Sequence, residues 1–168
     1  AITDELLIVD DPGGTPVSKR IDVGDLLSLE FGQVYTTGGA GTQSPGAAYA
    51  LCTQIASDGL SSAGVTPDAA NNKITITNTG HYLVAFQISF VGANSATCNA
   101  RIYWNGAAQT HITLERTMGA AAAVGSGSAI GIVDVSTGAT DIDLRIQTTS
   151  GVFDIKELQL IVVRVGNT

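Results

Sequence analysis

Turn sequences recur at short intervals along most of this chain, and their spacing restricts how the chain can fold. They are Ser57-Asp58-Gly59, Pro67-Asp68, Asn71-Asn72, Thr79-Gly80, Asn94-Ser95, Asn105-Gly106, Ser136-Thr137-Gly138 and Ser150-Gly151. The segments between them are strand-like: 73–78, 81–91, 96–104, 110–117, 128–135, 141–148 and 157–165. Short strands separated by such turns predict an all-β fold, an antiparallel β-sandwich.

Side-chain alternation within these segments shows which strands have one apolar face and which have two. In 141–148, Ile142, Leu144 and Ile146 alternate with polar residues, as in a strand that covers a core with one face. Segment 81–91 has one strongly apolar face and a second face that begins apolar and ends polar. Segment 157–165 is largely apolar on both faces, so a two-layer sandwich must cover it again with another subunit or with the N-terminal region. Cover by another subunit would make the protein an oligomer, and this strand is the first indication of one.

The charge of the chain excludes several classes of partner. Eight Lys and Arg stand against fifteen Asp and Glu, a net charge of −7, which repels a nucleic-acid backbone. No apolar run is long enough for a membrane helix and no leader precedes the first strand, so we expect no membrane partner and synthesis in a cytoplasm. Cys52 and Cys98 are too few for a disulfide framework and are expected to be buried free thiols.

The N-terminal region is acidic and has the pattern of a hairpin. The turn sequence Asp11-Pro12-Gly13-Gly14 separates the possible strands Glu5–Val9 and Val17–Val23. Asp22 is a plausible cap for a helical turn that would extend to Leu29. We predict a short β-arm for docking over residues 1–36, a Gly-rich linker over 37–46 and a sandwich domain over 47–168.

Patterns typical of enzymes are missing from the sequence. His81 and His111 accompany neither a nucleophile elbow nor a zinc motif. Asp141 and Asp143 share a strand face roughly 6.6 Å apart, a spacing that glycoside hydrolysis allows, but they point away from the apolar side of their strand. We expect no enzymatic activity, no cofactor and no metal.

Two aromatic residues are candidates for surface recognition. Tyr103 and Trp104 directly precede the turn Asn105-Gly106, where at least one ring should be partly exposed. A core position for Trp104 is an equally good interpretation. If the protein contacts a host cell-surface glycan, these residues are the first candidates.

The order of elements from residue 71 to residue 166 resembles the jelly roll shared by tumour necrosis factor and the globular head of complement. The matching strings are KITITNTGHYLVAFQISF with its Gly80-x-Tyr82, ARIYWNGA, GSGSAIGIVDVSTGATDIDLRI and ELQLIVVRV. The family's usual Gly-Asp pair is replaced here by Gly138-Ala139-Thr140-Asp141. The resemblance implies a homotrimer around a three-fold axis. The aromatic face of 82–90 would then belong to the sandwich core or to the subunit contact, and we assign the subunit contact to Tyr82, Leu160, Val162 and Arg164.

The string DELLIVDDPGGTPVSKRIDVGDLL is similar to segments of tailed-bacteriophage virion proteins. This resemblance implies that the arm docks onto the major capsid protein or another virion protein. The docking residues would be Leu6, Leu7, Ile8, Val9, Lys19, Arg20 and Ile21.

Together, the two resemblances lead us to expect a non-enzymatic virion structural protein on the capsid surface. It would be a homotrimeric decoration or cement protein, or a head fibre. The alternatives are the receptor-binding tip of a phage tail fibre or spike, which would recognise a host glycan or protein, and a secreted or spore-surface jelly roll with lectin behaviour.

Overall fold

A computed structural model describes residues 5–10, 17–22, 29–39, 41–119 and 123–167, the first two segments by their backbone alone. The strands are β1 (Glu5–Asp10), β2 (Val17–Asp22), β3 (Phe31–Thr36), β4 (Gly41–Gln43), β5 (Ala50–Leu51), β6 (Ser57–Ser61), β7 (Val65–Asp68), β8 (Lys73–Ile76), β9 (Gly80–Gly92), β10 (Thr97–Trp104), β11 (Ala107–Thr117), β12 (Val124–Val135), β13 (Thr140–Thr148) and β14 (Phe153–Gly166). One 3-10 turn, η1, spans Ala69–Asn71. Within these described segments, no helix is long and apolar enough to cross a membrane.

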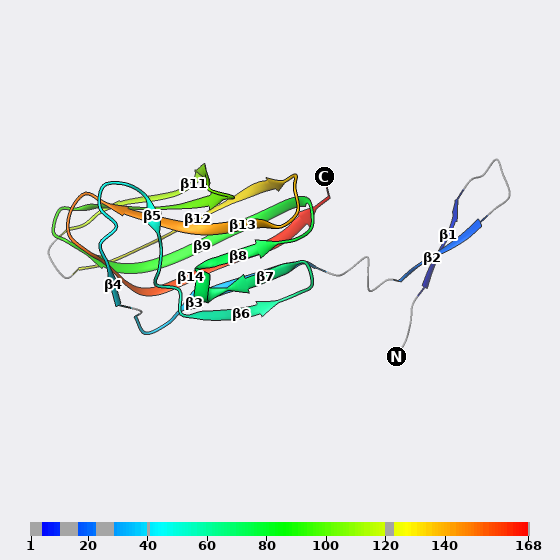
Figure 1. Cartoon of the computed structure of the whole chain (residues 1–168), viewed down its shortest axis with the longest axis horizontal. Helices are drawn as coiled ribbons and strands as arrows, with labels where there is room; N and C mark the ends of the chain where they lie inside the picture. Colours follow the sequence, from blue (N-terminus) through cyan, green and yellow to red (C-terminus); the bar gives the residue numbers. More distant parts are fainter. Residues whose placement is uncertain (1–4, 11–16, 23–28, 40, 120–122, 168) are drawn as a thin grey trace.

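Two antiparallel sheets of six strands each pack face to face and form the head of the molecule (Figure 1). One sheet, called here the β9 sheet, has the order β12-β9-β14-β3-β6, with β4 paired to β14. The other, the β10 sheet, has the order β11-β10-β13-β8-β7, with β5 paired to β13. This architecture confirms the predicted antiparallel β-sandwich, and all seven strands expected between residues 73 and 165 are present.

The core lies between the two sheets and follows the predicted alternation. On β9 the buried side chains are Tyr82, Val84, Phe86, Ile88 and Phe90, and β13 contributes Ile142, Leu144 and Ile146. The ring of Phe90 lies 4.3 Å, centroid to centroid, from that of Phe153 at the start of β14. These apolar surfaces leave water together, which supplies the main free energy that holds the two sheets against each other.

The predicted boundary between arm and head is wrong, because β3 belongs to the sandwich. Residues 31–36 pair with β14, from Phe31 opposite Val163 to Thr36 opposite Leu158. Residues 41–43 of the predicted linker also pair with β14 as β4. The stretch FGQVYT buries Gly32, Val34 and Thr36, and only Val34 among these is a typical core residue, so its alternation is hard to recognise in sequence.

The hairpin predicted near the N-terminus is present as β1 and β2. Its register runs from Glu5 opposite Asp22 to Asp10 opposite Val17. The two strands pair only with each other among the strands described, and they lie apart from the sandwich (Figure 1). Asp22 is the last residue of β2, and the rest of the predicted helical turn lies almost entirely outside the described residues.

Candidate functional site

The β9 sheet has a second face that points away from the core, and we call it the open face. Strand register places its side chains in rows across the strands. From one end to the other, the rows are Ile132-Leu83-Val163-Phe31, Ile130-Ala85-Ile161-Gln33, Ser128-Gln87-Gln159-Tyr35 and Ser126-Ser89-Glu157. The open face is therefore apolar at one end and polar at the other, as the alternation in 81–91 predicts.

The apolar half of the open face has no cover within the described chain. Ile130 and Ile132 are 62% and 54% exposed, and Val165 beyond them is 53% exposed. The β10 sheet is different on its solvent side, where charged residues such as Lys73 and Arg145 form ion pairs. An exposed apolar area on strands whose other face packs in the core is typical of an interaction surface.

The polar half of the open face forms a groove of about 700 Å³. Gln33, Gln87, Gln159, Ser126 and Glu157 are among the residues that line it. The three glutamine side chains are joined by hydrogen bonds of 3.0 and 3.3 Å across β9, β14 and β3. The groove thus offers amide and hydroxyl groups beside the apolar rows.

The subunit contact assigned to Tyr82, Leu160 and Val162 needs correction. All three side chains have no exposed surface and face the core of their own chain, so they cannot contact another subunit. The alternation separates the two faces of β9 and β14 correctly, but both faces are apolar and the sequence does not show which one meets the β10 sheet. The apolar side chains that point to the open face are instead those of their neighbours in sequence, such as the half-buried Leu83 and Ile161.

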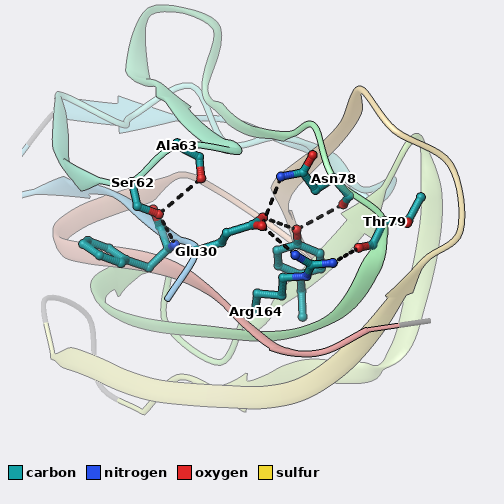
Figure 2. A network of polar contacts seen from close by, with 8 residues as sticks. Glu30, Ser62, Ala63, Asn78, Thr79 and Arg164 are labelled. Atoms are coloured by element: carbon teal, nitrogen blue, oxygen red, sulfur yellow. Dashed lines mark hydrogen bonds and ion pairs between the residues drawn. The ribbon is translucent and has the colours of Figure 1, made fainter. Parts of the chain in front are cut away.

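Arg164, the fourth residue assigned to that contact, belongs to a polar cluster around Glu30 at one end of the head (Figure 2). The Glu30 carboxylate accepts hydrogen bonds from Arg164 Nη1 at 2.6 Å, the Tyr82 hydroxyl at 2.8 Å and Asn78 Nδ2 at 3.0 Å. The Arg164 backbone N–H donates to the Glu30 carbonyl at 2.7 Å, and Arg164 Nη2 donates to the Thr79 carbonyl at 2.6 Å. This Glu30 cluster fixes the chain where it enters β3.

Gly80 allows the Glu30 cluster to form. Its φ of +151° is unfavourable for other residues, and a Cβ there would lie 2.6 Å from the Gly166 carbonyl oxygen and 2.7 Å from Arg164 Nε. Any side chain would therefore push β14 and its arginine away from Thr79. The Gly-x-Tyr motif thus has a physical basis: Gly80 makes room for Arg164, and Tyr82 donates to the same carboxylate as Arg164.

The Tyr82 hydroxyl should make stability fall at high pH. Burial, followed by the hydrogen bond to Glu30, raises the pKa of Tyr82 above its ordinary value. Above about pH 10 the unfolded chain releases this proton while the folded chain keeps it, so the free energy of unfolding decreases as pH rises. We expect Tyr82→Phe to weaken this decrease and to cost about 1–2 kcal/mol at neutral pH. Urea unfolding at neutral and alkaline pH measures both effects.

Tyr103→Phe is the matched control for this experiment, because it removes the hydroxyl of another tyrosine, a half-buried one that is not part of the Glu30 cluster. If the decrease is equally steep with and without the Tyr82 hydroxyl, another group is responsible.

The predicted recognition pair does not form an exposed aromatic patch. Tyr103 is half-buried, with its ring centroid 6.0 Å from that of Tyr49 and the Arg145 guanidinium 4.2 Å above it. Trp104 packs against the core. The Asn105 N–H donates to the Asp141 carbonyl, which places the turn at the same end of the head as the Glu30 cluster.

The seven residues predicted for docking all lie on the hairpin, Leu6 to Val9 on β1 and Lys19 to Ile21 on β2. The register sets Leu6 opposite Ile21, Leu7 opposite Arg20 and Ile8 opposite Lys19. Basic and apolar positions are thus adjacent across the two strands. The side chains of these seven residues are outside the part of the molecule that the structure describes.

The remaining candidates have partners within the chain. Asp141 is bound by Lys73 at 2.9 Å and by Thr75 at 2.7 Å, and Asp143 by Arg145 at 2.8 Å. Within the described segments, no three His, Cys, Asp or Glu side chains are arranged to hold a metal ion.

The histidines and cysteines also have simple surroundings. His81 lies 3.5 Å from Asp134, and His111 lies 3.1 Å from the Ile132 carbonyl oxygen. Cys52 and Cys98 are buried free thiols, and burial raises the pKa of Cys52 to about 11, so it is protonated and unreactive at neutral pH.

Sequence reasoning missed Glu30, Asn78 and the three glutamines of the groove. A charged Arg164 within the apolar run ELQLIVVRV is a signal for a buried ion pair, but Glu30 lies 134 residues away and one sequence does not identify it. Glutamines in the middle of alternating strands indicate a solvent-exposed face. The strand pairing is needed to show that Gln87 and Gln159 lie side by side, with Gln33 one row away and within hydrogen-bond reach of Gln159.

The fold is that of the tumour necrosis factor type of jelly roll. Eiger TNF from S. frugiperda is similar with a TM-score of 0.60 at 13% identity, covering 83% of this chain and 94% of that one. Murine APRIL, in a crystal structure at pH 5.0, is similar with a TM-score of 0.53 at 15% identity, covering 81% of this chain and all of that one. No protein-family model and no curated protein sequence matches the chain.

Proposed function

We propose that this protein is a non-enzymatic structural protein of a tailed-bacteriophage particle. In this proposal three copies join through the open face, and the β1–β2 hairpin of each copy docks onto the major capsid protein or another virion protein. The protein would act as a capsid decoration or cement protein, or as a head fibre. The observation that carries the proposal is a head with an uncovered apolar sheet face joined to a separate hairpin.

The chemistry of the open face supports contact with copies of the same chain. The central rows, from Ile132 to Tyr35, carry no charged residue although the chain has a net charge of −7. Two such faces can meet without bringing like charges together, and burial of their aliphatic side chains is favourable. The jelly-roll likeness adds the expectation of three copies.

The Glu30 cluster supports a docking role for the hairpin. It fastens the chain to β14 directly after residues 1–28, which are called the arm from here on, so every copy in a symmetric assembly would present its arm from the same end. Several arms that bind one particle together raise the apparent affinity by about 10²–10⁴ over a single arm. The function is then cohesion, which requires no catalytic site.

Removal of residues 1–28 tests this proposal. The truncation keeps Leu29 and Glu30, because Glu30 belongs to the folded head. We expect the shortened protein to retain its circular dichroism and the trimeric mass of the full chain in light scattering. It should no longer co-sediment with phage heads that lack the protein, whereas the full chain should do so.

Two results would contradict the proposal. A monomeric full chain would remove the role of the open face, and undiminished co-sedimentation of the shortened protein would remove the role of the arm. A full chain that ignores heads but adsorbs to host cells would favour the alternative, a receptor-binding tip. The positions of Tyr103 and Trp104 do not favour that alternative, because Trp104 packs against the core and the turn lies at the end from which the arm departs.

A further inference from the structure

The three glutamines of the open face form a hydrogen-bonded chain with a direction, which we call the glutamine row. It joins Gln87 and Gln159, which lie opposite each other, to Gln33 in the adjacent register row. Gln87 on β9 donates from Nε2 to Oε1 of Gln159 on β14, and Gln159 donates from Nε2 to Oε1 of Gln33 on β3. In both bonds a side-chain amide N–H donates to the side-chain amide oxygen on the next strand. Within the described chain this leaves the Gln87 side-chain oxygen and the Gln33 side-chain NH₂ group as the two open ends of the row.

The row lies next to the apolar part of the open face. In register, Gln87 and Gln159 follow directly after the row that contains Ala85 and Ile161. Apolar contact is non-directional and by itself lets two flat faces slide past each other. An amide that is buried without a partner costs about 1–3 kcal/mol, so the glutamines penalise every arrangement that leaves them unpaired.

Resting on the self-association proposed above, we infer that the glutamine row sets the register of the subunit contact. The Gln87 end of one copy meets the Gln33 end of the next copy, which pairs an acceptor with a donor. The apolar rows supply the affinity, and the glutamine row selects one arrangement. A single polar position in an apolar interface can fix register in this way.

Engineered disulfides test the inference directly. Gln33 and Gln87 lie on strands separated by β14, about 9.6 Å apart at two strand spacings, which exceeds the reach of about 7 Å between Cα atoms in a disulfide. In the full-length variant Gln33→Cys with Gln87→Cys, any bond between the new cysteines must therefore join two copies. We expect mild oxidation to convert most of the protein into covalent species up to the size of the assembly on non-reducing gels.

The controls separate this inference from the proposed function. Gln33→Cys with Gln147→Cys uses a glutamine on the other sheet and should stay in single chains. The natural Cys52 and Cys98 are buried. A double variant that is assembled in light scattering but forms no covalent species would overturn the inference and leave the proposed function intact. A full chain that is monomeric before any substitution would overturn the proposed function and the inference with it.

A second variant removes the middle of the row without a new covalent bond. Gln159→Met keeps the length of the side chain but neither donates nor accepts as an amide does. We expect assembly to persist while the fraction in the main species falls at least about twofold in native mass spectrometry, with other oligomers appearing. Gln147→Met is the matched control and should behave like the unmodified protein. A single species with unchanged mass in Gln159→Met would contradict the inference.

Discussion

In the proposed assembly through the open face, a glutamate in place of Ile161 is expected to convert the oligomer into folded monomers. Ile161 lies in the centre of the open face, opposite Ala85 on one side and Gln33 on the other. A carboxylate there must leave water without a partner and approach its own copies. Uncompensated burial of a charge costs about 3–5 kcal/mol, so the dissociation constant should rise by a factor of about 10² to a few times 10³.

Light scattering and circular dichroism distinguish loss of assembly from loss of the fold. The side chain of Ile161 points away from the sandwich core, so the spectrum of the variant should match that of the unmodified protein. Val152→Glu is a suitable control, because Val152 is an exposed aliphatic residue in the turn before β14 and belongs to none of the rows of the open face. Retention of the full oligomeric mass by Ile161→Glu would show that copies meet elsewhere.

The second large effect is expected at Arg164, where replacement by Gln should reduce the free energy of unfolding by about 2–4 kcal/mol. The Glu30 side chain is only 13% exposed and that of Arg164 only 25%, so solvent compensates little for the lost ion pair. The Thr79 carbonyl also loses its donor. Chemical denaturation of the full chain gives the change.

A double-mutant cycle shows whether the two residues act together. We expect Glu30→Gln combined with Arg164→Gln to be less destabilising than the sum of the single changes. The pair Lys73 and Asp141 provides a matched cycle, because it joins two strands at 2.9 Å but is 31% and 38% exposed, where such pairs contribute only about 0–1 kcal/mol. Additive effects in the Glu30 cycle would mean that the charges contribute independently.

The sequence predicts the strands of the second half of the chain well, because turn pairs and alternation are local signals. It fails for β3, where glycine and threonine occupy buried positions that usually hold aliphatic side chains. It also separates the two faces of β9 and β14, but the face it assigns to the subunit contact lies in the core of the sandwich. Which face meets the other sheet depends on pairings distant in sequence, such as Ile161 with Gln33 and Glu30 with Arg164.

The bond between the Arg164 N–H and the Glu30 carbonyl has a practical consequence for surface display. It places the start of β3 and the end of β14 at the same end of the head. At the opposite end, β9 ends and β14 begins, and Gly92 pairs with Phe153. In the proposed docking through the arm, a peptide attached directly after β14 would lie on the side of the support. A peptide inserted at the turn before Phe153, around Gly151 and Val152, would project outward in as many copies as the assembly has subunits.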